Sequence, residues 1–181
     1  LLMFLLPAQE AGFAGWIPTY AIKAGVSSAS ESAVYSSLFW STNSAFRIIW
    51  VFLPLSATNK MKIVFLGLLT ISTLLTLLQH LELYQLLCIT GPLLLGIMTS
   101  VLYGLCLTLS IDNGFSSTTS NNANFVLANC IGETLLTGPM GYSMKIFGFQ
   151  SLIVIILVSC IASNLSFHHA LKSLDTDKQE Q

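Results

Sequence analysis

The sequence predicts an all-α membrane protein with six transmembrane helices, on the basis of its composition and the length of its apolar runs. Hydrophobic residues make up 54% of the 181 residues and charged residues only 8%, with a mean hydropathy of +0.76. A soluble domain carries roughly 25% charged residues because its surface must be wetted. Seven basic and eight acidic side chains cannot cover a soluble particle of this length, so lipid must solvate much of the chain.

Short polar segments separate the apolar runs. Crossing about 30 Å of hydrocarbon takes roughly 20 helical residues, and a helix satisfies its own backbone polar groups in lipid. The runs are continuous rather than alternating, which excludes a strand barrel. We expect a six-helix bundle over residues 1–171, with spans at about 1–24, 33–55, 61–79, 84–109, 120–143 and 149–169, then a disordered cytoplasmic tail over 172–181.

The distribution of lysines predicts that both ends of the chain are cytoplasmic. Six spans place the two ends on the same side of the membrane. Four lysines fall on that side and two on the other: Lys60, Lys62, Lys172 and Lys178 against Lys23 and Lys145. Because cytoplasmic loops carry the excess of basic residues, we expect a multi-pass protein of the plasma membrane with cytoplasmic termini.

Several function classes lack support in this sequence. The net charge of −1 offers no basic field for nucleic acid. The four cysteines lie in apolar runs without a CxxC pattern, so neither a disulfide framework nor a zinc site is expected. No nucleophile–base pair or phosphate loop stands out, and we expect neither enzymatic activity nor a cofactor. A membrane-embedded enzyme would have to use Asp112, His168 and His169.

Charged residues divide the spans into two kinds. The first, second and fifth spans each hold an ionisable residue well inside: Glu10, Arg47 and Glu133. The fourth is uncharged but is expected to break at Gly91 and Pro92, whereas the third and sixth are plain and expected to face lipid. Two spans that hold an ionisable residue or a break, followed by one span with neither, thus occur twice in order. This is typical of the three-plus-three internal repeats of transporters.

Each of these charges is costly in a membrane. An ionisable side chain at a helix centre costs roughly 2.5–3.5 kcal/mol on insertion scales, so it needs a partner or a water-filled cavity. Glu10 and Arg47 lie at similar depths, which makes a pair between them geometrically possible, while Glu133 lies nearer mid-membrane. For any one of them, a structural pair that locks two helices is the alternative interpretation.

Amides and an aromatic ring accompany the charges. Asn43 precedes Arg47 by one helical turn, and Asn122 and Asn129 share a face with Glu133. Trp16 belongs to an aromatic stripe beside Glu10. Carboxylates, amides and a flat apolar ring together are what a sugar-sized polyol needs. The alternatives are that the asparagines join helices and that Trp16 anchors the interface.

Four segments resemble the second half of a major facilitator superfamily transporter. They are EAGFAGWIPTYA (10–21), SLFWSTNSAFRIIW (37–50), GIMTSVLYGLCLTLS (96–110) and ANFVLANCIGETLLTGPMGY (123–142), similar to the seventh, eighth, tenth and eleventh helices of the family. The likeness is to the branch of sodium-dependent glucose transporters and fucose/glucose symporters. Gly104 stands where relatives often have Pro.

The resemblance implies a six-helix C-terminal half with a three-plus-three repeat that works by alternating access. It implies cation-coupled sugar uptake with Na⁺ or H⁺ as the coupling ion, a missing N-terminal six-helix half and the lipid bilayer as partners. We expect pathway charges at Glu10, Arg47 and Glu133, substrate contacts at Asn43, Asn122 and Asn129, and a stacking platform at Trp16. The alternative is a truncated isoform or fragment that does not transport and acts as a membrane interaction partner.

Overall fold

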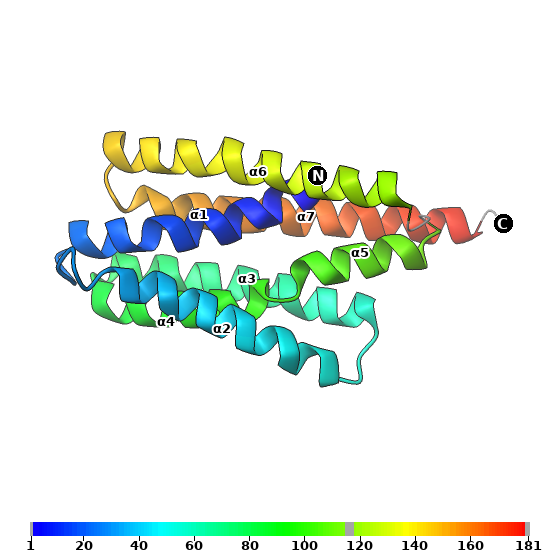
Figure 1. The fold of residues 1–181 in the computed structure, drawn as a ribbon, viewed down its shortest axis with the longest axis horizontal. Coiled ribbons are helices and arrows are strands. Elements are labelled where there is room, and N and C mark those ends of the chain that lie inside the picture. The colour runs from blue at the N-terminus through cyan, green and yellow to red at the C-terminus, as the bar shows by residue number, and fades with distance from the viewer. Residues whose placement is uncertain (1, 115–117, 180–181) are drawn as a thin grey trace.

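The computed structural model describes residues 2–114 and 118–179 and shows an antiparallel bundle of helices (Figure 1). No strand occurs within these residues, which confirms the predicted all-α class. The helices are α1 (Leu2–Lys23), α2 (Ala33–Phe52), α3 (Ala57–His80), α4 (Tyr84–Thr99), α5 (Leu102–Asp112), α6 (Thr119–Ile146) and α7 (Ser151–Gln179).

Three stretches of the described chain are long and apolar enough to cross a membrane: Ala57–His80, Tyr84–Asp112 and Ser151–Ala170. These stretches comprise α3, α4 with α5, and most of α7, so the membrane character of the fold rests on them. The other helices, α1, α2 and α6, have 22, 20 and 28 residues. They are long enough for the hydrocarbon core, but they are the three that carry Glu10, Arg47 and Glu133.

Local sequence explains where the helices begin and end. Ser56 and Thr118 precede α3 and α6, and each hydroxyl accepts a hydrogen bond from the backbone N–H three residues later, as N-cap residues do. Gly25 and Gly148 follow α1 and α6 with φ of +71° and +89°. Such left-handed positions favour glycine and end a helix. Apart from the C-terminal end of α7, the outer boundaries of the spans therefore lie within a few residues of those predicted.

The predicted break in the fourth span is in the wrong place. α4 continues through Gly91 and Pro92, and the chain leaves the helix only at Ser100 and Val101. Both Gly91 and Pro92 are buried, and a Cβ at Gly91 would lie 3.1 Å from the ring of Phe13. A proline is tolerated inside a membrane helix when neighbouring helices pack closely around it. Here Pro92 does not end the helix.

The tail also differs from expectation, because α7 continues as a helix to Gln179 rather than ending near residue 171. The sequence from Ala170 to Gln179 contains neither glycine nor proline. Once a helix is nucleated, each further residue adds one backbone hydrogen bond. With no residue to stop it, the long helix of the sixth span extends into the polar tail.

Helix α1 lies at the centre of the bundle (Figure 1). It packs most extensively against α6 and also against α7, α2 and α4. α4 packs most extensively against α2 and next against α3, and α3 packs against α7. Exchanging α1, α2 and α3 for α4, α6 and α7 maps the main contacts onto one another: α1–α6 corresponds to α4–α2, and α1–α7 corresponds to α4–α3.

Helices α3 and α7, which contain the predicted spans without an interior charge, do not simply face lipid. Along α3, Phe65 and Leu68 are fully buried, while Leu66 on the opposite face is 66% exposed. The ring of Phe65 stacks on Phe167 of α7 with centroids 4.6 Å apart. Each helix therefore has one face in the bundle core and one face outside it, as an amphipathic position in the bundle requires.

Candidate functional site

Three of the predicted site residues form one hydrogen-bonded chain. Asn43 Nδ2 donates to Glu10 Oε1 at 2.9 Å, and Asn43 Oδ1 accepts from Arg47 Nη2 at 3.0 Å. The same Asn43 amide donates to Thr99 Oγ1 at 3.0 Å. Asn43 is buried at 1% exposure, so a single amide connects α1, α2 and the end of α4.

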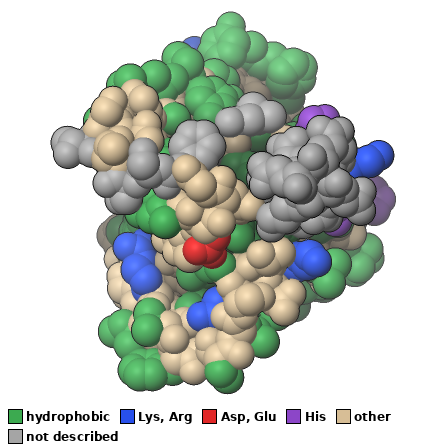
Figure 2. Space-filling model, turned by 90° about the vertical axis from the view of Figure 1, so that its right-hand side faces the viewer, with side chains coloured by type: hydrophobic (Ala, Val, Ile, Leu, Met, Phe, Trp, Pro, Cys, Tyr) green, Lys and Arg blue, Asp and Glu red, His purple; other side chains and the backbone are tan. Residues whose placement is uncertain are grey.

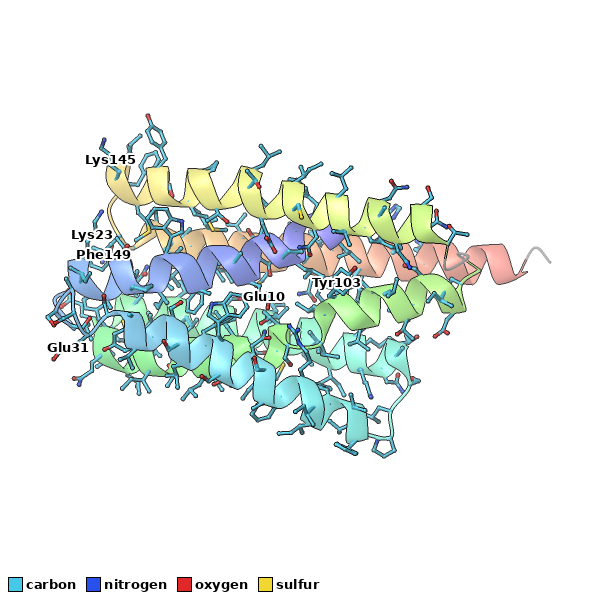
Figure 3. All side chains as sticks on the ribbon, viewed as in Figure 1. Glu10, Lys23, Glu31, Tyr103, Lys145 and Phe149 are labelled. Carbon is cyan, nitrogen blue, oxygen red and sulfur yellow. The ribbon has the colours of Figure 1, made fainter. Side chains whose placement is uncertain are left out.

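The helix packing brings these side chains together. Glu10 projects from the central helix α1 about halfway along the bundle, toward α2 and α5 (Figure 3). α2 approaches α4 at Gly96, where an added Cβ would lie 2.9 Å from the backbone oxygen of Phe39. Only glycine allows this close approach, which sets Asn43 beside Thr99. The site therefore depends on a backbone contact as well as on its polar side chains.

No direct ion pair joins Glu10 to Arg47 in the part of the chain that the structure describes, because Asn43 lies between them. Glu10 nevertheless lies within electrostatic range of both Arg47 and Glu133. The predicted pairing of the first two charges is thus an indirect one, through an amide that donates to one and accepts from the other. An amide bridge of this kind can satisfy a carboxylate and a guanidinium together.

The exposure of the site is uneven. Glu10 is half-buried and Asn43 fully buried, whereas Arg47 is exposed on the outer surface of α2. A guanidinium has five N–H donors, and Arg47 uses two nitrogens, on Asn43 and on the backbone oxygen of Ser100. The remaining donors belong to an exposed side chain, at a depth in the predicted second span where lipid offers no acceptors.

The second carboxylate of the predicted site lies on α6. Asn129 Nδ2 donates to Glu133 Oε1 at 2.9 Å, as expected for residues one turn apart. Nearer the start of α6, Asn122 is half-buried, and its buried Oδ1 has no hydrogen-bond partner among the residues that the structure describes. Glu133 is within electrostatic range of Glu10, and no hydrogen bond among the described residues joins the two networks.

Trp16 lies between helices. Its indole N–H donates to the backbone oxygen of Thr137 at 2.9 Å, and its ring lies so close to Gly141 that a Cβ there would overlap it. These contacts join α1 to α6. The geometry favours a helix-packing role for Trp16 over the predicted role of stacking platform.

Sequence reasoning missed the contribution of the residues at the α4–α5 junction. Thr99 and Ser100 are buried at 3% and 4% exposure, and Trp50 Nε1 donates to the backbone oxygen of Ile97 at 3.1 Å. The adjacent Thr and Ser in an otherwise apolar run, and Trp50 three residues after Arg47, were the available signals. Neither shows by itself that the helix is interrupted.

A second, neutral polar cluster lies on the other side of α1. Gln9 Nε2 donates to Ser163 Oγ of α7 at 2.8 Å, and the Cys160 thiol donates to Gln9 Oε1 at 3.6 Å. All three residues are at most 4% exposed. This cluster was not predicted, because amides, hydroxyls and thiols are too common in membrane helices to be distinctive.

Within the described residues, no group of three or more His, Cys, Asp or Glu side chains could hold a metal ion. The polar groups that lie close together are a carboxylate, amides, a hydroxyl and a guanidinium, and these groups can form hydrogen bonds. No family model, curated protein or solved structure matches the chain. The likeness to the major facilitator superfamily rests on the four segments quoted above.

Proposed function

We propose that the chain is the C-terminal six-helix half of a facilitator-type transporter, which moves a sugar-like solute across the membrane by alternating access. The observation that carries the proposal is the hydrogen-bonded chain from Glu10 through Asn43 to Arg47, beside the interrupted helix α4–α5. Ionisable residues within membrane helices mark substrate and ion pathways, because lipid does not solvate them. Discontinuous helices in transporters form binding sites near the middle of the membrane.

The other wall of the pathway would come from a second six-helix half. Arg47 is exposed on this bundle, yet it belongs to a segment that we place in the membrane. A guanidinium there requires water, an acceptor or another protein surface. An N-terminal half packed over α2 and α6 would enclose the charges of the present chain in a cavity between the two halves.

The order of helix contacts supports a repeat of three plus three helices. α1 packs against α6 as α4 packs against α2. The contact between α3 and α7 stays the same when α1, α2 and α3 are exchanged for α4, α6 and α7. Internal repeats of this kind are common in secondary transporters. The packing agrees with the order of charged and plain spans in the sequence, and the resemblance of four segments to known helices points in the same direction.

Within this transporter, the polar residues divide into coupling and binding groups. A Na⁺ ion or proton would neutralise Glu10 or Glu133 as the cavity reorients. Amides and the guanidinium would bind sugar hydroxyls, with Asn43, Asn129 and Arg47 as the contacts. The unpartnered buried oxygen of Asn122 offers a further acceptor on α6.

The distribution of charge supports cytoplasmic termini at the plasma membrane. The end of the bundle where α3 and α6 begin carries several Lys and Arg side chains together with His (Figure 2). Lys60 and Lys62 lie near the start of α3, at this end of the bundle. Lys23, Lys145 and Glu31 lie at the opposite end (Figure 3). The excess of basic residues at the first end favours a cytoplasmic position for it.

Uptake of radiolabelled glucose tests the proposal, in vesicles that hold the full-length protein containing this chain, with a Na⁺ or a proton gradient. Arg47→Ala and Glu133→Gln are each expected to lower the uptake rate about 10- to 100-fold, which corresponds to the loss of hydrogen bonds to a charged group. Glu31→Gln, in an exposed connection, is the matched control and keeps the wild-type rate. Normal uptake by both test variants would show that the site is wrongly assigned.

A membrane interaction partner that does not transport is the second candidate, favoured by the same exposed face of α2. In that case the wild-type protein takes up no solute under either gradient. Arg47→Ala would then weaken co-purification with another membrane protein. The uptake assay therefore separates the two functions before any variant is made.

A further inference from the structure

The interruption between α4 and α5 leaves two backbone oxygens for other donors. α4 ends at Thr99 and α5 begins at Leu102, with Val101 at φ −112° and ψ −5°. Within the described residues, no backbone N–H donates to the oxygens of Ile97 or Ser100. In a continuous helix these oxygens would accept from residues 101 and 104. Carbonyls left unpaired in a membrane are costly, so other donors must satisfy them.

Side chains of α2 supply two of the donors. The Ser100 hydroxyl supplies a third, to Ile97 O at 2.7 Å. Arg47 Nε donates to Ser100 O at 3.0 Å, and Trp50 Nε1 donates to Ile97 O at 3.1 Å. Residues 47 and 50 are one turn apart, so both reach the junction from one face of α2. A positive guanidinium also suits the negative C-terminal end of α4. The Arg47 guanidinium therefore lies at the C-terminal end of α4, where a positive charge is favourable.

The same guanidinium is tied to Glu10 through a single residue. Arg47 Nη2 donates to Asn43 Oδ1, and Asn43 Nδ2 donates to Glu10 Oε1. The charged groups that act on Glu10 are Arg47 from α2 and Glu133 from α6. A change of charge at Glu10 therefore reaches the helix junction through one amide.

Helix α5 is held less firmly than α4. It packs mainly against α3 and less against α1, whereas α4 packs against α2, α3 and α1. Of its eleven residues, only Leu102, Leu105 and Cys106 are buried. With few packed side chains, its position depends strongly on the hydrogen bonds at its junction with α4.

We propose that Arg47 is a positioning residue that holds α5 in line with α4, and that Asn43 makes this hold depend on what occupies the Glu10 carboxylate. The dependence on Glu10 rests on the proposed function, and the hold itself does not. When Na⁺ or a proton neutralises Glu10, the Asn43 amide loses its charged acceptor and can turn. Arg47 then loses the acceptor that fixes its side chain, its bond to Ser100 is released as well, and α5 swings away from the core.

Two native cysteines report this movement. Cys106 lies on α5 just beyond the junction and is 7% exposed, while Cys88 lies on α4 before it and is fully buried. Cys130 on α6 is exposed and is replaced by Ser in the test protein. The membrane-embedded full-length protein is treated with N-ethylmaleimide, and the labelling rate of each cysteine is measured by mass spectrometry.

Arg47→Ala is expected to raise the labelling rate of Cys106 on the order of tenfold, as expected for the loss of hydrogen bonds from a charged donor. The rate at Cys88 stays at its wild-type value. Arg47→Lys, which offers a point charge without the planar fork, gives an intermediate rise. Glu10→Gln gives a smaller rise at Cys106 alone, since it removes only the charge.

Lys60→Gln is the matched control. The Lys60 amine donates to the backbone oxygen of Trp50 at 2.8 Å, so this variant also removes a basic side chain from a carbonyl near the end of α2, but not from α4. Its labelling rates should equal those of the wild type. Trp50→Phe keeps an aromatic ring at this position but removes the indole N–H that donates to Ile97. It is expected to raise the labelling rate at Cys106 only.

Equal rises at Cys88 and Cys106 in Arg47→Ala would overturn the proposal, because they would indicate general loosening of the bundle. An unchanged rate at Cys106 would overturn it as well. A response to Arg47→Ala without a response to Glu10→Gln would support the hold and overturn the link through Asn43. Because labelling needs no solute, a failed uptake assay together with a rise at Cys106 would reject the proposed transport and support the hold.

Discussion

The two sides of helix α1 solve the problem of polar groups in a membrane differently. Gln9 faces α7 and forms a neutral, fully buried cluster with Ser163 and Cys160. Its neighbour Glu10 faces α2 and belongs to a charged, partly exposed chain with Asn43 and Arg47. Neutral groups that satisfy one another can fix two helices together, whereas charged groups beside an open surface remain available to a ligand. Under the proposed function, adjacent residues of one helix serve structure and transport separately.

Replacing these neighbours one at a time gives the strongest test of the comparison. Glu10→Gln keeps an oxygen that can accept from Asn43 and removes the charge, so we expect uptake to fall about 10- to 100-fold while stability changes little. Gln9→Leu removes the donor to Ser163, and we expect it to lower stability by about 0.6 kcal/mol, the average for hydrogen bonds between membrane helices, and by no more than about 1.7 kcal/mol. Its uptake rate should stay near that of the wild type.

Uptake and unfolding in increasing denaturant are measured on the same protein preparations. Asn164→Ala serves as a control for loss of an interhelical amide elsewhere, since its Nδ2 donates to the backbone oxygen of Phe65. If Gln9→Leu lowered uptake as much as Glu10→Gln at equal amounts of folded protein, the division between the two sides of α1 would be wrong.

A second change separates α2 from α4 without touching the neutral cluster. Gly96→Ala places a Cβ 2.9 Å from the backbone oxygen of Phe39, which cannot rotate away as a side chain could. We expect a loss of about 1–3 kcal/mol, typical of overpacking, together with reduced uptake. Thermal unfolding followed by circular dichroism measures the stability.

Gly104→Ala is the matched control for this change, because no atom lies within 4 Å of the Cβ it would add. The same chemical change at an open position should leave stability unchanged or slightly raised, as alanine favours a helix more than glycine does. A similar loss at both glycines would mean that helix propensity, and not the contact between α2 and α4, sets the effect.

The elements that could be predicted from sequence depend on local spacing, and those that could not depend on packing. Asn43 and Arg47 were predicted to act together because one helical turn joins them, and they are hydrogen-bonded. The place of the helix break was not predicted, because proline at 92 is a stronger local signal than Ser100. The break at Ser100 depends on donors from α2, which are distant in sequence.

The orientation of Gln9 could not be predicted for a related reason. Periodicity shows that residues 9 and 10 point about 100° apart, but not which neighbour each one faces. That depends on the rotation of α1 among five packed helices, which is set by contacts such as Gly132 against the backbone of Phe4. Sequence identified the charges of the site, and tertiary packing decided their partners.

The smallest expected effect concerns a carboxylate outside the membrane helices, which serves as a reference for Glu10. Glu31 accepts hydrogen bonds from the Ser28 hydroxyl at 2.8 Å and from the Ser28 backbone N–H at 3.3 Å. These two donors hold the pKa of Glu31 below its ordinary value of 4.5. A lowered pKa means that the turn is stabilised above about pH 4.5 and loses this stabilisation as the pH falls through the pKa of the folded state.

Ser28→Ala removes the hydroxyl donor, so the pKa of Glu31 should rise toward its ordinary value, as measured by carbon-13 NMR titration of labelled glutamate. Ser30→Ala leaves both donors to Glu31 in place and should leave its pKa lowered. A pKa unchanged by Ser28→Ala would contradict the assigned cause. Neither variant should affect uptake, because water solvates Glu31 whether or not the serine is present. Glu10 has no such substitute for its partners, and its charge therefore acts on the helices that surround it.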